Sequence, residues 1–303
     1  MFIQDFSPEI FNIGFITVRW YSLLFALTFV VGFIILHHIY KRENKNIEDL
    51  DMLIIYIMIG TIVGARLGHC LFYEPDYYLL NPVEILKVWK GGLASHGGAI
   101  GILTAIYFYS KKKLNYSFLW TADRVVIAVA LGGLFIRLGN FINSEIYGIP
   151  TDVPWAVIFA SLGDNLPRHP TQIYEALTYF LIFILLWTIY KKSNVRGYRI
   201  KCGMTVEKSG SLKDRHCGLD PQSPQHYNNT KPKQPQKDGL LFGIFLVLVF
   251  ASRFMWEFLK EVQSDFERNL LLDMGQILSI PFVLLGIFMI FYSNYNFLFT
   301  KRK

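Results

Sequence analysis

The sequence TVRWYSLLFALTFVVGFIILHHIY, residues 17–40, has no Lys, Arg, Asp or Glu after Arg19. A helix of about 20 apolar residues crosses the roughly 30 Å hydrocarbon core of a bilayer. The stretch is too long for the core of a signal peptide, and no obvious cleavage site follows it. We therefore interpret it as a retained membrane span.

Apolar blocks of similar length recur along the chain. They lie at residues 51–73, 91–110, 118–138, 171–190, 239–258 and 274–293. The block at 118–138 is the least clear, because it contains Asp123 and Arg124. Only 17% of the 303 residues are charged, whereas a soluble domain has about a quarter. The sequence predicts an all-α polytopic membrane protein with about seven transmembrane helices, forming one domain over residues 1–303.

The distribution of basic residues predicts the orientation. Segments 41–49, 111–117, 191–238 and 300–303 hold 20 of the 30 Lys and Arg, and the segments between them outside the spans hold 6. Lys and Arg accumulate on the cytoplasmic side. We therefore expect a periplasmic N-terminus, a cytoplasmic C-terminus and an odd number of spans. Residues 139–170, with four prolines and four charges, are expected to be a periplasmic segment.

Residues 195–238 differ in composition from the rest, being rich in Lys, Gln, Pro, Ser and Asn. Such a segment buries too little apolar area to offset the entropy of ordering. We expect a disordered cytoplasmic insertion, more readily an inert one than a docking loop. The net charge of +7 does not indicate nucleic acid in a membrane protein, and the three scattered cysteines form no disulfide framework.

Four arginines lie in or at the end of apolar blocks: Arg66, Arg124, Arg137 and Arg253. A guanidinium in hydrocarbon costs at least roughly 2.5–3.5 kcal/mol, so each needs a reason. One explanation is an ion pair between helices or a side chain that reaches the interface. Arg124, beside Asp123 and near the lysines 111–113, fits that explanation. The other three fall in the outer half of their spans, where we expect them to converge on one site.

Guanidinium groups bind phosphate through paired, charge-assisted hydrogen bonds. The abundant phosphate at that depth is the phospholipid headgroup, so a phospholipid is a natural ligand. A transporter or flippase for a phosphorylated solute or lipid would need the same groups. A purely structural membrane subunit is a third alternative, against which the energetic penalty of the buried charges argues.

The sequence GGLASHGG, residues 91–98, places His96 between two glycine pairs at the outer end of a span. Glycine pairs loosen a helix and free backbone N–H groups, which is tolerated at this depth only beside a cavity or ligand. A histidine there is suited to general base catalysis, because its usual pKa is near neutrality. A packing role for His96 is the alternative. The segment is neither a Walker A nor a GxSxG sequence.

Polar residues also follow Arg137. Asn140, Asn143 and Glu145 come directly after it, and they either bind the hydroxyls of a headgroup or cap the helix and support the arginine. Arg253 and Glu257 have i, i+4 spacing and share a helix face, so a structural ion pair is as good an explanation for Glu257 as catalysis. Tyr21 lies where an interfacial aromatic belt is expected.

Together these segments resemble the prolipoprotein diacylglyceryl transferase family of bacterial membrane enzymes. The resemblance covers nearly the whole chain except about 195–238, where the family has a short loop. One departure is Ile136, which stands where the family's signature has glycine. The segments that carry the resemblance are RWY (19–21), GGLASHGG (91–98), RLGNFINSEIYG (137–148), RHPTQIYE (168–175), RFMWEF (253–258) and MGQILS (274–279).

The resemblance implies a reaction in the bacterial inner membrane. A diacylglyceryl group moves from phosphatidylglycerol to the lipobox cysteine of a prolipoprotein signal peptide, and glycerol phosphate is released. We expect Arg137 and Arg253 to hold the phosphate and His96 to take the thiol proton, with no metal and no cofactor. The expected substrate-binding residues are Tyr21, Arg66, Arg137, Asn140, Asn143, Glu145, Gly148 and Glu257.

Overall fold

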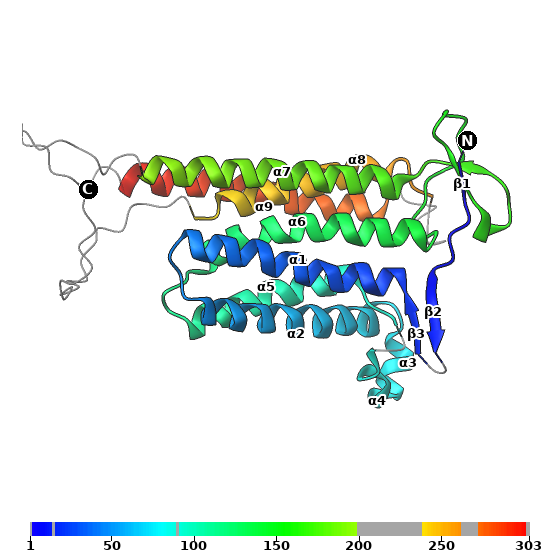
Figure 1. Cartoon of the computed structure of the whole chain (residues 1–303), viewed down its shortest axis with the longest axis horizontal. Coiled ribbons are helices and arrows are strands. Elements are labelled where there is room, and N and C mark those ends of the chain that lie inside the picture. Colours follow the sequence, from blue (N-terminus) through cyan, green and yellow to red (C-terminus); the bar gives the residue numbers. More distant parts are fainter. Residues whose placement is uncertain (1, 14–15, 89–90, 199–237, 262–271, 301–303) are drawn as a thin grey trace, which may run out of the picture.

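The computed structural model describes all residues except 1, 14–15, 89–90, 199–237, 262–271 and 301–303. Within the described residues, seven long helices run side by side (Figure 1). They are α1 (Trp20–Arg42), α2 (Ile47–Phe72), α5 (Ser95–Lys112), α6 (Phe118–Ile142), α7 (Thr171–Tyr198), α8 (Leu240–Glu257) and α9 (Met274–Thr300). The polytopic helical fold predicted from the sequence is confirmed.

Six of these seven helices are long and apolar enough to cross a membrane, by length and composition. The exception is α5, which was predicted as a span at residues 91–110 but begins four residues later. Its 18 residues reach about 27 Å, but they include Ser95-His96-Gly97-Gly98 at one end and two lysines at the other. Both ends of this helix are therefore polar, and it lies alongside α2 within the bundle.

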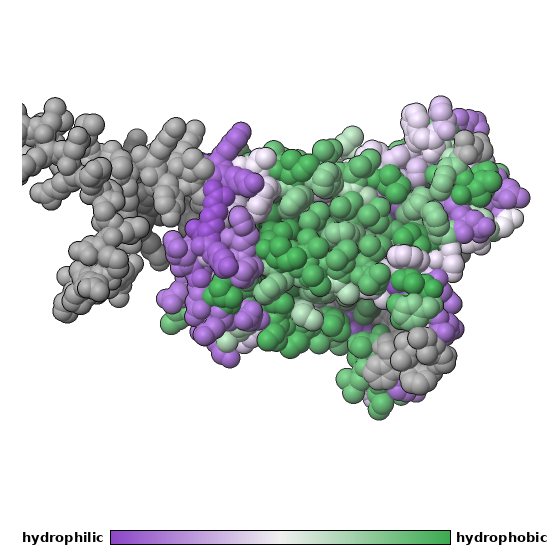
Figure 2. Space-filling model, in the orientation of Figure 1, coloured by the Kyte–Doolittle hydropathy of each residue, from purple (hydrophilic) through white to green (hydrophobic). Residues whose placement is uncertain are grey.

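The surface of the bundle is apolar along its middle. Figure 2 shows a broad hydrophobic zone over the helices and a hydrophilic zone at the end where α1 stops. Large apolar side chains are exposed on several helices, including Val30, Ile34, Ile59, Leu181 and Phe288. A water-soluble monomer rarely exposes a contiguous apolar surface of this kind. The surface therefore fits a surrounding bilayer.

The closest helix contact in the bundle joins α2 to α5. A Cβ atom added to Gly64 would lie 2.4 Å from the carbonyl oxygen of Gly97, and one added to Gly101 would lie 1.9 Å from that of Gly60. Small residues allow membrane helices to approach this closely. The contact fixes the depth and rotation of α5, and so determines where the start of α5 lies.

One end of the bundle, here called the head end, carries the described strands, α3 (Pro75–Leu80), α4 (Pro82–Ile85) and residues 143–170. β1 (Phe2–Gln4) pairs in parallel with β4 (Val157–Phe159), which pairs with β5 (Pro167–Arg168). β2 (Glu9–Ile13) and β3 (Ile16–Arg19) form a hairpin. These short strands were not predicted from the sequence. The opposite end holds residues 43–46, 113–117 and Asp238.

Polar contacts attach the head end to the bundle. The buried side chain of Gln4 donates to the Ile142 carbonyl (3.0 Å) and accepts from Ser144 (2.8 Å), so the N-terminal strand is held at the end of α6. Arg168 contacts both Asp164 and Glu261. Because Arg168 donates to it, the pKa of Asp164 lies below its usual value. Residues 143–170 thus form an ordered cap, and their periplasmic location stays a prediction. The predicted insertion at 195–238 lies almost wholly outside the described residues.

Candidate active site

Four charged side chains from three parts of the chain form a continuous network at the head end. Nε of Arg137 on α6 lies 2.8 Å from Oε2 of Glu175 on α7. The other Glu175 oxygen lies 2.9 Å from Nζ of Lys260, just after α8. Lys260 also donates to Glu257 at 3.0 Å. The network therefore connects α6, α7 and α8 through alternating charges.

This network is largely buried. The side chains of Glu175 and Lys260 are 4% and 5% exposed. Removing one member of a buried ion pair leaves an uncompensated charge and is strongly unfavourable. The backbone around Lys260 is also held, because residue 260 forms a β-bridge with Gly148. Glu175 and Lys260 were not predicted as site residues from the sequence.

The segment after Arg137 forms one hydrogen-bonded unit. Nη1 of Arg137 donates to Oδ1 of Asn140 (3.3 Å), and Nδ2 of Asn140 donates to Glu145 (3.1 Å). Asn143 donates to the other oxygen of Glu145 at 3.3 Å, and Gln172 donates to its backbone carbonyl at 2.7 Å. Arg137 therefore keeps one terminal nitrogen, Nη2, that makes no hydrogen bond among the described residues.

Two glycines bring neighbouring elements close to this unit. A Cβ atom on Gly139 would lie 2.8 Å from the ring of Tyr21, so α1 and α6 meet there. Tyr21 is close enough to Arg137 and Glu145 to be influenced by both charges. A Cβ atom on Gly148 would lie 2.6 Å from both the Leu259 carbonyl oxygen and the His169 side chain. Any larger residue at position 148 would displace the backbone beside Lys260.

Arg253 differs from the other arginines. Among the residues that the structure describes, its guanidinium makes no hydrogen bond and no ion pair, although the residue is partly buried on α8. Its charge acts on Glu175 and on His96. Arg253 is therefore a cation at the edge of the network with its hydrogen-bond donors available to a ligand.

His96 lies in the first turn of α5, and it is exposed. Its imidazole is influenced by the charges of Arg253 and Glu257 on α8. Arg137 and Arg253, two of the three arginines expected to converge, both interact electrostatically with Glu175, and the catalytic roles of His96, Arg137 and Arg253 stay predictions. The imidazole of His96 and the guanidinium of Arg253, on two different helices, are close enough for their charges to interact.

Arg66 does not join this group. All three of its nitrogens donate to backbone carbonyls: Nε to Ile85 (3.0 Å), Nη2 to Glu84 (2.7 Å), and Nη1 to Gly91 (2.6 Å) and Gly92 (3.2 Å). These contacts use four of the five N–H donors of the guanidinium, and the side chain is buried. The first glycine pair thus presents carbonyl oxygens to Arg66, rather than freeing N–H groups as the sequence suggested. The contacts give Arg66 a structural role in holding residues 84–92.

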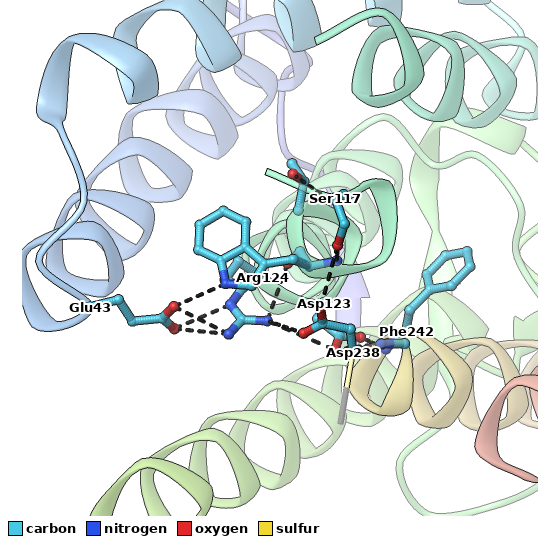
Figure 3. Close-up of polar contacts among 9 residues, drawn as sticks. Glu43, Ser117, Asp123, Arg124, Asp238 and Phe242 are labelled. Carbon is cyan, nitrogen blue, oxygen red and sulfur yellow. Dashed lines mark hydrogen bonds and ion pairs between the residues drawn. The ribbon is translucent and has the colours of Figure 1, made fainter. Parts of the chain in front are cut away.

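Arg124 lies in a second charged cluster at the opposite end, shown in Figure 3. It donates to both oxygens of Glu43 (3.1 and 3.2 Å) and to the Trp120 carbonyl. Asp123 accepts from the backbone N–H groups of Gly239 and Phe242, each at 2.8 Å, and so caps the start of α8. The structural explanation for Arg124 is supported, with Glu43 rather than the adjacent Asp123 as its main partner.

The two missed residues carried a usable signal. Glu175 lies four residues inside an apolar block, where a lone carboxylate is as unfavourable as a lone guanidinium. It therefore required a cationic partner. The sequence could not identify that partner, because Arg137 and Lys260 are 38 and 85 residues away along the chain. Only the packing of α6, α7 and α8 brings them together.

The fold and site define a helical membrane protein with a buried network of charged side chains at one end of its bundle. Comparison with known proteins identifies the group to which it belongs. The family model "Prolipoprotein diacylglyceryl transferase" matches residues 8–205 and 226–292, and the chain belongs to this family. Residues 206–225, inside the predicted insertion, are not matched.

Several curated relatives cover almost the whole chain. A phosphatidylglycerol–prolipoprotein diacylglyceryl transferase of Chloroherpeton thalassium is 45% identical over 95% of this chain and 93% of its own length. The protein of the same name from Tolumonas auensis is 44% identical over 97% and 98%. That from Porphyromonas gingivalis is 39% identical over 94% and 92%.

Proposed function

We propose that this chain transfers the diacylglyceryl group of phosphatidylglycerol to the lipobox cysteine of a prolipoprotein, with the head end at the outer face of the bacterial inner membrane. The cysteine sulfur forms a bond to the glyceryl CH₂ carbon that carries the phosphate. The carbon–oxygen bond to phosphate breaks, and glycerol phosphate leaves with the bonding electrons. The thiol proton passes to a base. The names of the relatives support both substrates.

The arginines stabilise the leaving group. A phosphodiester carries one negative charge, and a second charge develops on the phosphate oxygen as the carbon–oxygen bond breaks. Preorganised donors aimed at a developing charge lower the barrier more than they strengthen ground-state binding. Arg253, whose donors are free among the described residues, provides most of this stabilisation. Arg137, oriented by Glu175 and Asn140, provides its remaining nitrogen.

His96 takes the thiol proton. A free cysteine thiol has a pKa of about 8.5, and the thiolate is the nucleophile. The imidazole is exposed and close enough to Arg253 for their charges to interact, so a thiol that approaches a phosphate bound by Arg253 would come near it. The imidazole then carries the proton away while the sulfur attacks from the side opposite the phosphate.

The remaining predicted residues shape the headgroup region. Asn140, Asn143 and Glu145 form the polar wall next to Arg137, and Tyr21 covers it from α1. Gly148 leaves room for the backbone beside Lys260. Glu257 holds Lys260 and so maintains the network. Arg66 is not included, because it is buried and four of its five N–H donors already bind backbone carbonyls.

The observation that carries this proposal is the Arg253 guanidinium, which makes no hydrogen bond or ion pair among the described residues and lies near His96 beside a buried charge network. The test uses purified enzyme, phosphatidylglycerol and a lipobox peptide, with adduct formation followed by mass spectrometry. Wild-type enzyme should add one diacylglyceryl group to the peptide. His96→Gln should still bind phosphatidylglycerol but lose transfer. Normal turnover in that variant would rule out His96 as the base, and no adduct with wild-type enzyme would favour a transporter.

A further inference from the structure

The segment between α2 and α5 exposes many large apolar side chains. Residues 72–88, here called the arm, contain α3 and α4. Leu80 is 82% exposed, Phe72 is 79% exposed and Leu86 is 73% exposed. Leu79 and Val83 are also exposed. In water this much apolar surface on 17 residues would be unfavourable. The arm therefore requires an apolar partner.

The position of the arm indicates that partner. In Figure 1, α3 and α4 are displaced sideways from the bundle at the level where α2 ends. An arm placed in this way runs along the membrane surface rather than away from it. Figure 2 shows hydrophobic residues at the same place. The arm is also continuous with the lipid-facing side of α2, where Ile59, Val63 and Leu71 are exposed.

The polar residues of the arm are also typical of a membrane interface. Tyr73 and Tyr77 are exposed, and tyrosines gather at the level of the lipid headgroups. Lys87 pairs with Glu84 at 2.5 Å, so two of the charges of the arm neutralise each other. An interfacial segment combines apolar residues, aromatic residues and a few charges in this way.

The arm is firmly attached to the bundle at its base. Arg66 donates to the carbonyls of Glu84 and Ile85 in the arm and to those of Gly91 and Gly92 beyond it. The buried ring of Tyr78 lies beneath the same guanidinium, 5.0 Å from its carbon. One buried side chain therefore connects the arm to the glycine pair.

The glycine pair leads directly to His96. Gly91 and Gly92 both have positive φ angles, +86° and +68°, which favour glycine. A Cβ on Gly92 would lie 2.9 Å from Nη1 of Arg66. Two residues later, the Ala94 N–H donates to the Ala65 carbonyl at 2.9 Å, just before α5 begins. Any shift of the arm is thus transmitted over a short path to the first turn of α5.

We propose that the arm docks in the interface of the outer leaflet and, through Arg66, positions the start of α5 so that His96 meets its substrate. Arg66 is then a positioning residue, and the partner of the arm is a lipid surface. The docking half of this proposal is independent of the proposed function. The positioning half rests on it.

The docking experiment uses a fluorescent probe. In a chain carrying Cys70→Ala, Cys202→Ser and Cys217→Ser, the variants Leu80→Cys and Leu86→Cys are labelled with NBD and placed in phosphatidylglycerol nanodiscs. Docking predicts blue-shifted emission and quenching by lipids spin-labelled near the headgroup. Asn165→Cys, an exposed polar position on the same end of the bundle, should remain in water. Arm probes that move to an apolar environment only when lipobox peptide is added would contradict the proposal and indicate a peptide-binding arm.

The positioning experiment combines an arm variant with an Arg66 variant. Leu80→Glu with Leu86→Glu, and separately Arg66→Lys, should lower kcat roughly 10- to 100-fold, the effect of a small misplacement of a reacting group. The KM for phosphatidylglycerol and the melting temperature should change little for the arm variant. Leu114→Glu, at an exposed loop position of the opposite end, is the matched control. Unchanged kcat in the arm variant would refute positioning, whereas absence of turnover in wild type would instead refute the proposed function.

Discussion

The two ends of α6 each carry a buried arginine in a charged cluster, and the two clusters differ in one respect. At the opposite end, the guanidinium nitrogens of Arg124 are engaged by Glu43, the Trp120 carbonyl and nearby aspartates. At the head end, Arg137 retains a nitrogen that has no partner among the described residues, and Arg253 has no hydrogen bond or ion pair within the described chain. One cluster is closed and the other is open.

Whether the donors of an arginine are already engaged within the protein distinguishes a structural role from a binding role more clearly than burial does. Both clusters lie at the ends of apolar helices, and both contain side chains that are almost fully buried. A closed cluster already satisfies its charges, so a ligand would have to break existing contacts. An open cluster retains donors whose best partner is an anion from outside the protein. The predictions below test this distinction.

The largest expected effect is the loss of transfer in Arg253→Gln. Removing a donor aimed at developing charge lowers kcat by roughly 10²- to 10³-fold. Stability should change by less than about 1 kcal/mol, because the side chain has no described partner to abandon. Adduct formation and thermal unfolding in detergent measure the two quantities. Arg19→Gln is the control, since Arg19 is an exposed arginine of the same end. Wild-type turnover in Arg253→Gln would mean that the open cluster is not the phosphate site.

Arg124→Gln should have the opposite outcome. It leaves Glu43 buried without its main partner, and removal of one member of a buried pair destabilises by roughly 3–5 kcal/mol. The melting temperature should fall, while turnover per folded molecule stays close to that of wild type. Lys41→Gln, an exposed change at the same end, should alter neither. Lost turnover with unchanged melting would show that the closed cluster takes part in function.

Much of the fold could be predicted from the sequence, because each membrane span is a local signal. The spans at residues 17–40 and 118–138 correspond to α1 and α6 within a few residues. The strands of the head end could not be predicted, since β1 pairs with β4 about 155 residues away. Such pairing depends on where the bundle brings the two segments, which no local pattern records.

The site was predictable in part for a related reason. Arg137, Arg253 and His96 were identified because a charge or a glycine-flanked histidine in an apolar block is conspicuous. Arg66 was equally conspicuous, yet its ligands are backbone carbonyls, which every residue has and no sequence pattern marks. The availability of donors, which distinguishes Arg253 from Arg66, is a property of packing alone.

Glu175→Gln should produce a smaller loss than Arg253→Gln. Glu175 orients Arg137 and Lys260. As a carboxylate it has no hydrogen-bond donor that could bind the phosphate itself. We expect kcat to fall roughly 10- to 100-fold through misplacement of Arg137. Glu175→Asp, which retains the charge but shortens the side chain, should recover part of the activity. If the Gln variant stays active and the Asp variant is impaired, the length of the side chain rather than its charge holds the network. If both are fully active, Arg137 does not need this anchor.

The smallest effect concerns the pH dependence of the cap formed by residues 143–170. The pKa of Asp164 is lowered in the folded protein because Arg168 donates to it. A lowered pKa means that the carboxylate stabilises the fold fully above its unfolded value of about 3.9, and that this contribution is lost as pH falls through the folded value. The ion pair between Asp164 and Arg168 should therefore stay intact between pH 7 and pH 5, and it should not alter the rate of hydrogen exchange in the cap over this range. Its loss should raise the exchange rate only in stronger acid. Asp164→Asn should remove that acid-dependent component.

The effect is small because Asp164 is exposed and its ion pair is screened by solvent, in contrast to the buried pairs of both clusters. An equally steep acid dependence in the Asn variant would assign the titration to another carboxylate, with Glu261, the second partner of Arg168, as the next to replace.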